Sequence, residues 1–298
     1  MPRILLPTSS RHCNFFNAKK ETTIRGLLGL PPGGPLFKYT NMEMLKYEID
    51  APVVAFSTKR AGGVGQGAYS SFNITHYCGD SAENVAANRA LLCTELGIAD
   101  ERLILPLQTH GTEVVEIDGA FLALDAASRA QRLHSVDAIF TRERGVCIGV
   151  STADCIPVLL YDEKSGAVAA IHAGWRGTVA GIVGKTMRIM KERYGTDFSS
   201  AKAVVAPGIS LDSFEVGDEV YEAFREASFP MESIARRYGE KWHIDLPEAN
   251  RLQLIAGGLS AENISLSGVC TFVSHDIFFS ARRLGVKSGR IFNGIMIK

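Results

Sequence analysis

The sequence predicts an α+β fold in which sheets pack against one another and helices lie outside them. From about residue 50 onward, short strand-like segments outnumber helical ones. The two kinds do not alternate regularly, which disfavours a doubly wound or barrel enzyme. Residues 46–298 contain neither an internal repeat nor a linker-like stretch, so we expect them to form a single catalytic domain.

The expected strands are short, rich in β-branched and apolar residues, and bounded by Gly or Asp. They cover residues 52–57, 112–117, 137–141, 146–151, 157–161, 168–172, 203–205, 264–270 and 291–297.

Two helices are predicted from their ends. Residues 82–96 follow Ser81, which can cap the free amides, and stop at Gly97. Residues 178–194 stop at Gly195 and place several apolar side chains on one stripe.

A third helix begins near residue 245, where the signature is more complete. Asp245 can cap it, Pro247 suits the first turn, and Glu248 stands three residues beyond the cap. Leu252, Ile255 and Leu259 continue at helical spacing.

The composition of the chain argues against several classes of protein. The 298 residues carry 32 basic and 32 acidic side chains, a balance that argues against a nucleic-acid or anionic-membrane partner. No apolar run reaches the roughly 18–20 residues of a membrane span, and no secretory signal is evident. Six cysteines without paired spacing indicate reduced thiols. We therefore expect a cytoplasmic enzyme with a small-molecule substrate, monomeric or weakly self-associating.

Residues 1–45 differ from the rest of the chain. They are basic, they lack periodicity, and they contain the breaker-rich run Gly-Leu-Pro-Pro-Gly-Gly-Pro at 29–35. We expect a disordered extension or a start codon assigned too early, with a transit peptide as the alternative.

Three polar segments stand where the chain leaves a regular element. They are Gln108-Thr109-His110-Gly111, Ser151-Thr152-Ala153-Asp154-Cys155, and His172-Ala173-Gly174-Trp175-Arg176-Gly177-Thr178. Two histidines and one cysteine would supply three zinc ligands and leave a fourth position open, which is the catalytic pattern. The same residues also fit a Cys155 nucleophile with His172 as its base. Asp154 is a candidate general base or partner of the ligands.

Anion-binding candidates lie in glycine-flanked turns. Arg60 opens the run Arg60-Ala61-Gly62-Gly63, whose amides and guanidinium suit a phosphate. Arg176 stands close to the start of the helix that follows His172.

Nine motifs in order make the chain from about residue 50 resemble the polyphenol oxidase (laccase-like) family, also described as multifunctional purine nucleoside phosphorylases or peptidoglycan-editing factors. The motifs are Phe56-Ser57-Thr58 with Arg60-x-Gly62-Gly63, Ser71-Phe72-Asn73, Gly79-Asp80, Asn88-Arg89, Gln108-Thr109-His110-Gly111, Thr152-Ala153-Asp154-Cys155-x-Pro157, His172-Ala173-Gly174-Trp175-Arg176-Gly177-Thr178, Gly208-x-x-x-x-x-Phe214-Glu215-Val216, and Cys270-Thr271 with Phe279-Ser280-x-Arg282-Arg283.

The resemblance implies that His110, Cys155 and His172 bind a catalytic zinc ion. It implies a single-domain α/β/β/α sandwich with mixed sheets, similar to the Cys–His toxin deamidases. It also implies phosphorolysis of adenosine, inosine and methylthioadenosine, and deamination of adenosine. Cys155, His172 and Asp154 are then the expected catalytic residues, and Arg60, Arg176 and Asn73 the expected contacts to nucleoside and phosphate.

Other functions remain open at this point. An amidase that edits peptidoglycan precursors, using Cys155 with or without metal, is the main alternative. Copper-dependent phenol oxidation is weaker, because multicopper chemistry needs several clusters of ligands and the seven histidines are scattered. A non-catalytic metal-binding or partner-binding module is the last.

Overall fold

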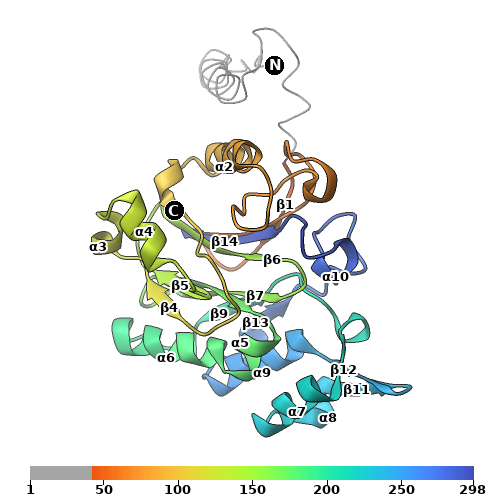
Figure 1. Ribbon diagram of the computed structural model, residues 1–298. Helices are drawn as coiled ribbons and strands as arrows, with labels where there is room; N and C mark the ends of the chain where they lie inside the picture. The colour runs from red at the N-terminus through yellow and green to blue at the C-terminus, as the bar shows by residue number, and fades with distance from the viewer. Residues whose placement is uncertain (1–41) are drawn as a thin grey trace, which may run out of the picture.

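The computed structural model describes residues 42–298, which form two large sheets and one small sheet with helices around them (Figure 1). The five-stranded sheet has the order β1 (Met44–Tyr47), β2 (Val53–Thr58), β14 (Ile291–Ile297), β6 (Cys147–Thr152) and β3 (Leu103–Ile104). The six-stranded sheet has the order β13 (Ile264–Leu266), β9 (Lys202–Val205), β7 (Ile156–Asp162), β8 (Ala167–Ala173), β5 (Ala138–Thr141) and β4 (Val114–Glu116). The three-stranded sheet has the order β10 (Glu215–Val216), β12 (Lys241–Ile244) and β11 (Ala235–Tyr238).

The α-helices are α2 (Ala82–Leu96), α3 (Gly119–Leu122), α4 (Ala126–Arg132), α5 (Trp175–Val179), α6 (Ile182–Tyr194), α7 (Asp218–Glu226), α8 (Met231–Ile234), α9 (Leu246–Ala256) and α10 (Ala281–Leu284). Most neighbouring strands pair antiparallel, whereas β3–β6, β4–β5 and β9–β13 pair parallel. The α+β class with mixed sheets is therefore confirmed.

The two large sheets lie face to face, and helices cover their outer faces (Figure 1). In β7, Val158 and Leu160 pack under α6 and α9, whereas Leu159 faces the core between the sheets with Ile148 and Ile295. On the outer face of the five-stranded sheet, side chains of β2 and β14 pack with those of α2. Because both faces of the central strands are covered, every residue of β6, β7, β8 and β14 is buried, and most of them are apolar.

Helix α2 has the predicted bounds, and Ser81 caps it by accepting a hydrogen bond from the Asn84 amide. Asp245 likewise caps α9 by accepting from the Glu248 amide. Leu259, which we expected to continue that stripe, lies beyond the end of α9 at Ala256.

Two expectations were wrong in part. The helix predicted over 178–194 is two helices, because Gly181 adopts a left-handed conformation with φ 76° between α5 and α6. The strand predicted over 264–270 ends at Leu266, since the chain turns away at Gly268, where φ is 65°. Both breaks use a backbone region that glycine enters without steric cost.

The break at Gly181 gives a testable stability difference. A Cβ at Gly181 meets no atom within 4 Å, so Gly181→Ala should cost only the left-handed backbone penalty of about 1–2 kcal/mol. Gly184 lies inside α6 with equally open space, and Gly184→Ala should stabilise by about 0.5–1 kcal/mol. Denaturant unfolding of the two variants should shift in opposite directions; equal shifts would contradict the assigned break.

The expected extension over residues 1–45 lies outside the described residues as far as residue 41. Its last residues enter the fold, because β1 begins at Met44 and pairs antiparallel with β2. Among residues 42–298, no helix is both long and apolar enough to span a bilayer.

Candidate active site

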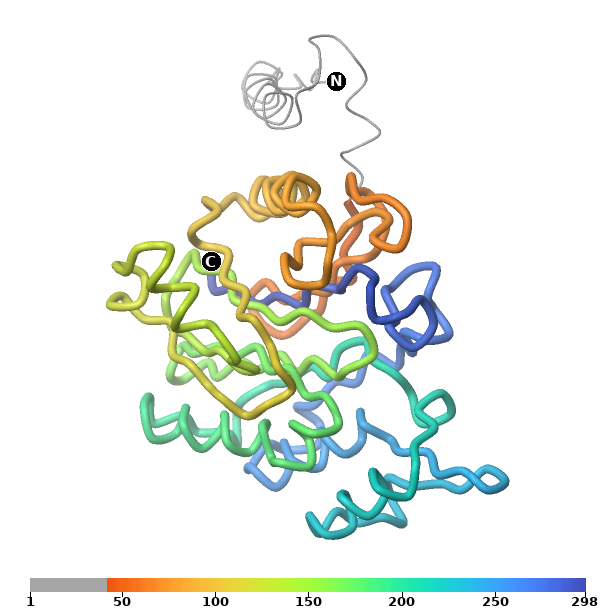
Figure 2. The backbone as a smooth tube through the Cα atoms, viewed as in Figure 1, coloured from red at the N-terminus to blue at the C-terminus, as the bar shows by residue number. Residues whose placement is uncertain are grey.

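Three segments from different parts of the chain, two loops and the end of strand β8, converge beside the six-stranded sheet. Figure 2 shows the connection between β3 and β4 running down beside the start of α5, where the Gly111 carbonyl lies close to Gly177. His110 comes from this connection, Cys155 from the turn between β6 and β7, and His172 from β8. One ligand atom of each side chain lies within 4.8 Å of the other two. His172 is buried, Cys155 is half-buried and His110 is exposed, so the cluster is open on one side.

The backbone around this cluster is unusual. His110 and Asp154 both have positive φ, 64° and 86°, which few non-glycine residues adopt. Such strained positions persist only where the surrounding structure holds them, and they concentrate at functional sites.

A glycine between β8 and α5 lies against two residues of the cluster. A Cβ at Gly174 would lie 2.9 Å from His110 Cδ2 and 3.1 Å from Cys155 Sγ. Any larger residue there would push the two side chains apart, which explains why the run after His172 begins Ala173-Gly174.

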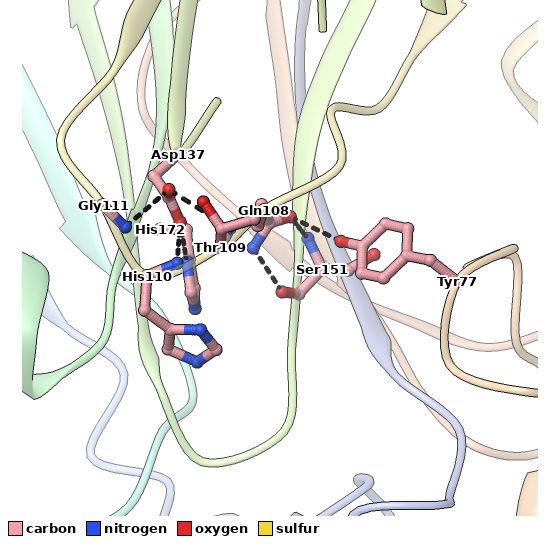
Figure 3. Close-up of polar contacts among 8 residues, drawn as sticks. All are labelled: Tyr77, Gln108, Thr109, His110, Gly111, Asp137, Ser151 and His172. Carbon is pink, nitrogen blue, oxygen red and sulfur yellow. Dashed lines mark hydrogen bonds and ion pairs between the residues drawn. The ribbon is translucent and has the colours of Figure 1, made fainter. Parts of the chain in front are cut away.

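Asp137 joins the loop that carries His110 to the end of β8 that carries His172, although no sequence motif marks it as a site residue. Its carboxylate accepts hydrogen bonds from the amides of Thr109 (3.3 Å), His110 (2.9 Å) and Gly111 (2.8 Å) (Figure 3). It also bonds His172 Nδ1 at 2.7 Å and is fully buried. A metal-ligating histidine commonly uses its second nitrogen in this way, which fixes the ring orientation.

Gln108 ties the same loop to the end of β6. Its side-chain amide accepts from the Ser151 amide at 2.7 Å and donates to the Ser151 carbonyl at 2.8 Å (Figure 3). Tyr77 donates its hydroxyl to the same Gln108 oxygen at 3.1 Å. The connection that carries His110 is therefore held at both sides of the histidine.

The electrostatics favour a deprotonated thiol. Burial alone would raise the pKa of Cys155, but the positive charge of His172 and hydrogen bonds from both histidines lower this pKa. Burial would lower the pKa of His172, whereas the Cys155 thiolate and the Asp137 carboxylate raise it. The metal-free cluster therefore favours a thiolate–imidazolium pair. Metal binding needs the thiolate and neutral imidazoles, so His172 would release its proton as the ion binds.

The donor set fits a single metal ion. Two imidazole nitrogens and a thiolate sulfur are ligands that zinc prefers, and here they lie within 4.8 Å of one another, so these three residues would hold the ion. Within residues 42–298, this is the one cluster of three His, Cys or acidic side chains with such convergence.

Arg60 and the glycine-rich turn after it are engaged by the protein itself. The guanidinium of Arg60 donates to the carbonyls of Ser70 and His275 and stacks on the Phe279 ring. The turn amides of Gly63, Val64 and Gly65 donate to Ser71 Oγ, Asn88 Oδ1 and the Ser71 carbonyl respectively. These amides are therefore not free to hold a phosphate in this structure.

Asn73 is also fully occupied. It is buried, and its amide nitrogen donates to Asp80 Oδ2 and to the Thr75 carbonyl. Its oxygen accepts from the amides of Thr75 and Arg290. Asn73 therefore holds its own loop against the residue before β14, and both polar atoms of its side chain are engaged.

Arg176 and Asp154 lie in contrasting surroundings. Arg176 is exposed, with its guanidinium 4.2 Å from the centre of the Trp175 ring, and no acceptor among residues 42–298 bonds it. Asp154 is buried, and both carboxylate oxygens accept hydrogen bonds, from the Thr271 hydroxyl and the Arg282 amide.

Comparison with known proteins places the chain in a family. Residues 54–298 match a family model described as multi-copper polyphenol oxidoreductase laccase. A purine nucleoside phosphorylase of Bacteroides thetaiotaomicron is 52% identical over 244 residues, covering 81% of this chain and 90% of that protein. Adenosine deaminase RL5, from an unknown prokaryotic organism, is 46% identical over 248 residues, covering 83% and 94%.

The fold has solved counterparts. The crystal structure of the Bacillus licheniformis hypothetical protein YfiH matches with a TM-score of 0.80 at 28% identity. The match covers 87% of this chain and 100% of that one.

Proposed function

This chain belongs to the family described as multi-copper polyphenol oxidoreductase laccase, and from that membership we propose that it is a zinc-dependent purine nucleoside phosphorylase that also deaminates adenosine. Its expected substrates are adenosine, inosine and methylthioadenosine, with phosphate as co-substrate. The observation that carries the proposal is the convergence of His110, Cys155 and His172 in a chain 52% identical to a phosphorylase and 46% identical to a deaminase.

Zinc fits this cluster better than the copper of the family description. One N₂S site leaves room for a fourth ligand, which is the usual arrangement of catalytic zinc. Multicopper oxidation needs several clusters, and residues 42–298 hold one. A zinc ion bound here would supply a Lewis acid and would lower the pKa of a bound water molecule to about 7.

The protein's own residues then position the reactants. Asp137 holds His172 through Nδ1, which turns Nε2 towards the cluster. Arg176 stands two residues beyond Gly174, where a Cβ would meet both His110 and Cys155, and its guanidinium is exposed. We assign to Arg176 the binding of phosphate beneath the ribose anomeric carbon, because Arg60 is engaged by backbone carbonyls.

Removal of this charge should affect phosphate selectively. Charge-assisted hydrogen bonds contribute about 1.5–3 kcal/mol, so Arg176→Ala should raise the KM for phosphate about 10–100-fold. Arg188→Ala is the matched control, because Arg188 is an exposed arginine that pairs with Glu192 along α6. An unchanged phosphate KM in Arg176→Ala would remove this residue from the site.

A second candidate function rests on the hydrogen-bonded series of thiol, imidazole and carboxylate in the same cluster. Cys155, His172 and Asp137 form a thiol–imidazole–carboxylate series, which suits acyl transfer without metal. The expected likeness to Cys–His toxin deamidases belongs with this alternative. Its substrate would be a peptidoglycan precursor carrying a wrong amino acid.

Product analysis separates the two functions. Purified protein is incubated with adenosine, with and without phosphate, and separately with the sugar-linked peptide precursor. Adenine released only with phosphate supports phosphorolysis, and inosine formed without it supports deamination. Cleavage of the precursor with nucleosides untouched would refute the proposal and favour the amidase.

A further inference from the structure

The turn that carries Cys155 is held by contacts with the chain that follows β9. Asp154 stands at φ 86°, and its carbonyl accepts a hydrogen bond from the Ile209 amide at 2.8 Å. Gly208 packs against the same turn, because a Cβ there would lie 3.1 Å from the Asp154 carbonyl oxygen and 3.2 Å from that of Cys155. Asp154, the residue before Cys155, is therefore held in place by Gly208 and Ile209, which follow β9.

The Asp154 side chain reaches in another direction, to the C-terminal segment, which we define as residues 271–282. One oxygen accepts from the hydroxyl of Thr271 and the other from the backbone amide of Arg282, each at 2.7 Å. Thr271 is fully buried and Asp154 nearly so. Short hydrogen bonds to a buried carboxylate are among the stronger ones in proteins, so a single side chain holds both ends of this segment.

Arg60 holds the middle of the same segment. Its guanidinium donates to the His275 carbonyl, and its own amide donates to the Ile277 carbonyl at 2.8 Å. It also stacks 5.0 Å from the centre of the Phe279 ring. The segment is thus fastened at its ends by Asp154 and at its centre by Arg60, although it contains long stretches without regular structure.

We propose that Asp154 is a positioning residue, which fixes Cys155 in the cluster by tying its turn to the C-terminal segment. An acid–base role would need a carboxylate oxygen directed at the substrate, whereas both oxygens are directed at donors of the protein. This role rests on the proposed function only in that Cys155 is taken as a metal ligand. Arg60 supports the same arrangement from the far side.

The variants separate two effects. One removes a hydrogen bond between Asp154 and the C-terminal segment but keeps the carboxylic acid, and another removes the acid but can keep the hydrogen bonds. Thr271→Val deletes the hydroxyl at nearly constant volume, and Thr271→Ser retains it. Asp154→Ala deletes both acceptors. In Asp154→Asn the amide oxygen can accept from Arg282, while the amide nitrogen donates to the Thr271 hydroxyl, which can turn to accept. Zinc affinity is measured by chelator competition, and hydrogen exchange of residues 271–282 is followed in the metal-free proteins.

We expect zinc affinity to fall about tenfold or more in Thr271→Val and Asp154→Ala, as when other partners of ligand residues are lost. Exchange in the C-terminal segment should rise in both. Thr271→Ser and Asp154→Asn should stay within about threefold of wild-type affinity, and activity in Asp154→Asn should fall less than tenfold. Thr141→Val controls for a lost buried hydroxyl elsewhere, since Thr141 bonds the Ile117 carbonyl, and should leave zinc affinity unchanged.

Opposite results would overturn the role. If Asp154→Asn binds zinc normally but loses activity by about 10²–10⁴-fold, while Thr271→Val behaves as wild type, Asp154 is a general acid or base. A wild type that binds no zinc would refute the proposed function instead. Hydrogen exchange in metal-free Thr271→Val would then still show whether Asp154 holds the C-terminal segment. Unchanged exchange would refute that role of Asp154.

Discussion

Cys155→Ala should lose both its bound metal and its phosphorolytic activity. Cys155 supplies the only sulfur in a cluster whose ligand atoms lie within 4.8 Å of one another, and two histidines alone are a poor zinc site. Loss of a partner outside the ligand shell costs about 10–100-fold in metal affinity or activity. We therefore expect zinc to fall from near one per chain to below about a tenth, and activity to fall at least about a hundredfold.

Cys270→Ala is the matched control for this variant. Cys270 is also a half-buried free thiol, but it bonds the Ser210 amide and Ser213 and lies outside the cluster. It should retain zinc. Full metal occupancy in Cys155→Ala would contradict the assigned site, whereas a metal-free wild type that is active until Cys155 is removed would indicate a thiol nucleophile.

Asp137→Asn should have the next largest effect, through a residue that touches no substrate. The buried carboxylate accepts from three successive amides and bonds His172 Nδ1. An asparagine must direct its amide hydrogens at one of these donors, which costs about 1–3 kcal/mol of stability. It also frees the His172 ring, so zinc affinity should weaken about 10–100-fold.

Asp162→Asn is the control for a loss of stability that is unrelated to the metal site. Asp162 is equally buried and accepts from the amides of Lys164 and Ser165 at the opposite end of β7 from Cys155. Thermal melts and chelator titrations of the two variants are compared. If both lose stability and only Asp137→Asn loses zinc affinity, Asp137 holds the cluster; equal zinc affinity in the two would contradict this.

Much of the fold follows from local signals. The strand at 291–297 and the helix at 82–96 have the predicted bounds, because a continuous apolar run and a Ser81–Gly97 pair of caps mark them. The break at Gly181 was missed because an isolated glycine inside a helical pattern is often tolerated. The hairpin of β11 and β12 turns at Gly239, where φ is 61°, but its exposed strand lacks the apolar alternation that predicts a strand.

The residues of the site that could be predicted are those whose reactive side chains stand in recognisable sequence motifs. His110, Cys155 and His172 were identified because each belongs to a polar segment that was expected where the chain leaves a regular element. Asp137 was not, since its role depends on β5 pairing antiparallel with β8, which brings it to His172 across 35 positions of sequence.

Arg60 illustrates the converse limit. A glycine-rich turn with an arginine predicts a phosphate site only if its amides are free. Here Ser71 and Asn88, from later in the chain, accept them. Hydrogen bonds between a loop and residues farther along the chain cannot be recognised from the local sequence pattern.

The most direct test of the zinc phosphorylase account is the metal content of the purified wild type, measured alongside phosphate-dependent adenine release from adenosine before and after chelation. We predict near-stoichiometric zinc, activity lost on chelation, and activity restored by zinc. A protein without zinc that releases adenine at an unchanged rate after chelation would contradict the account.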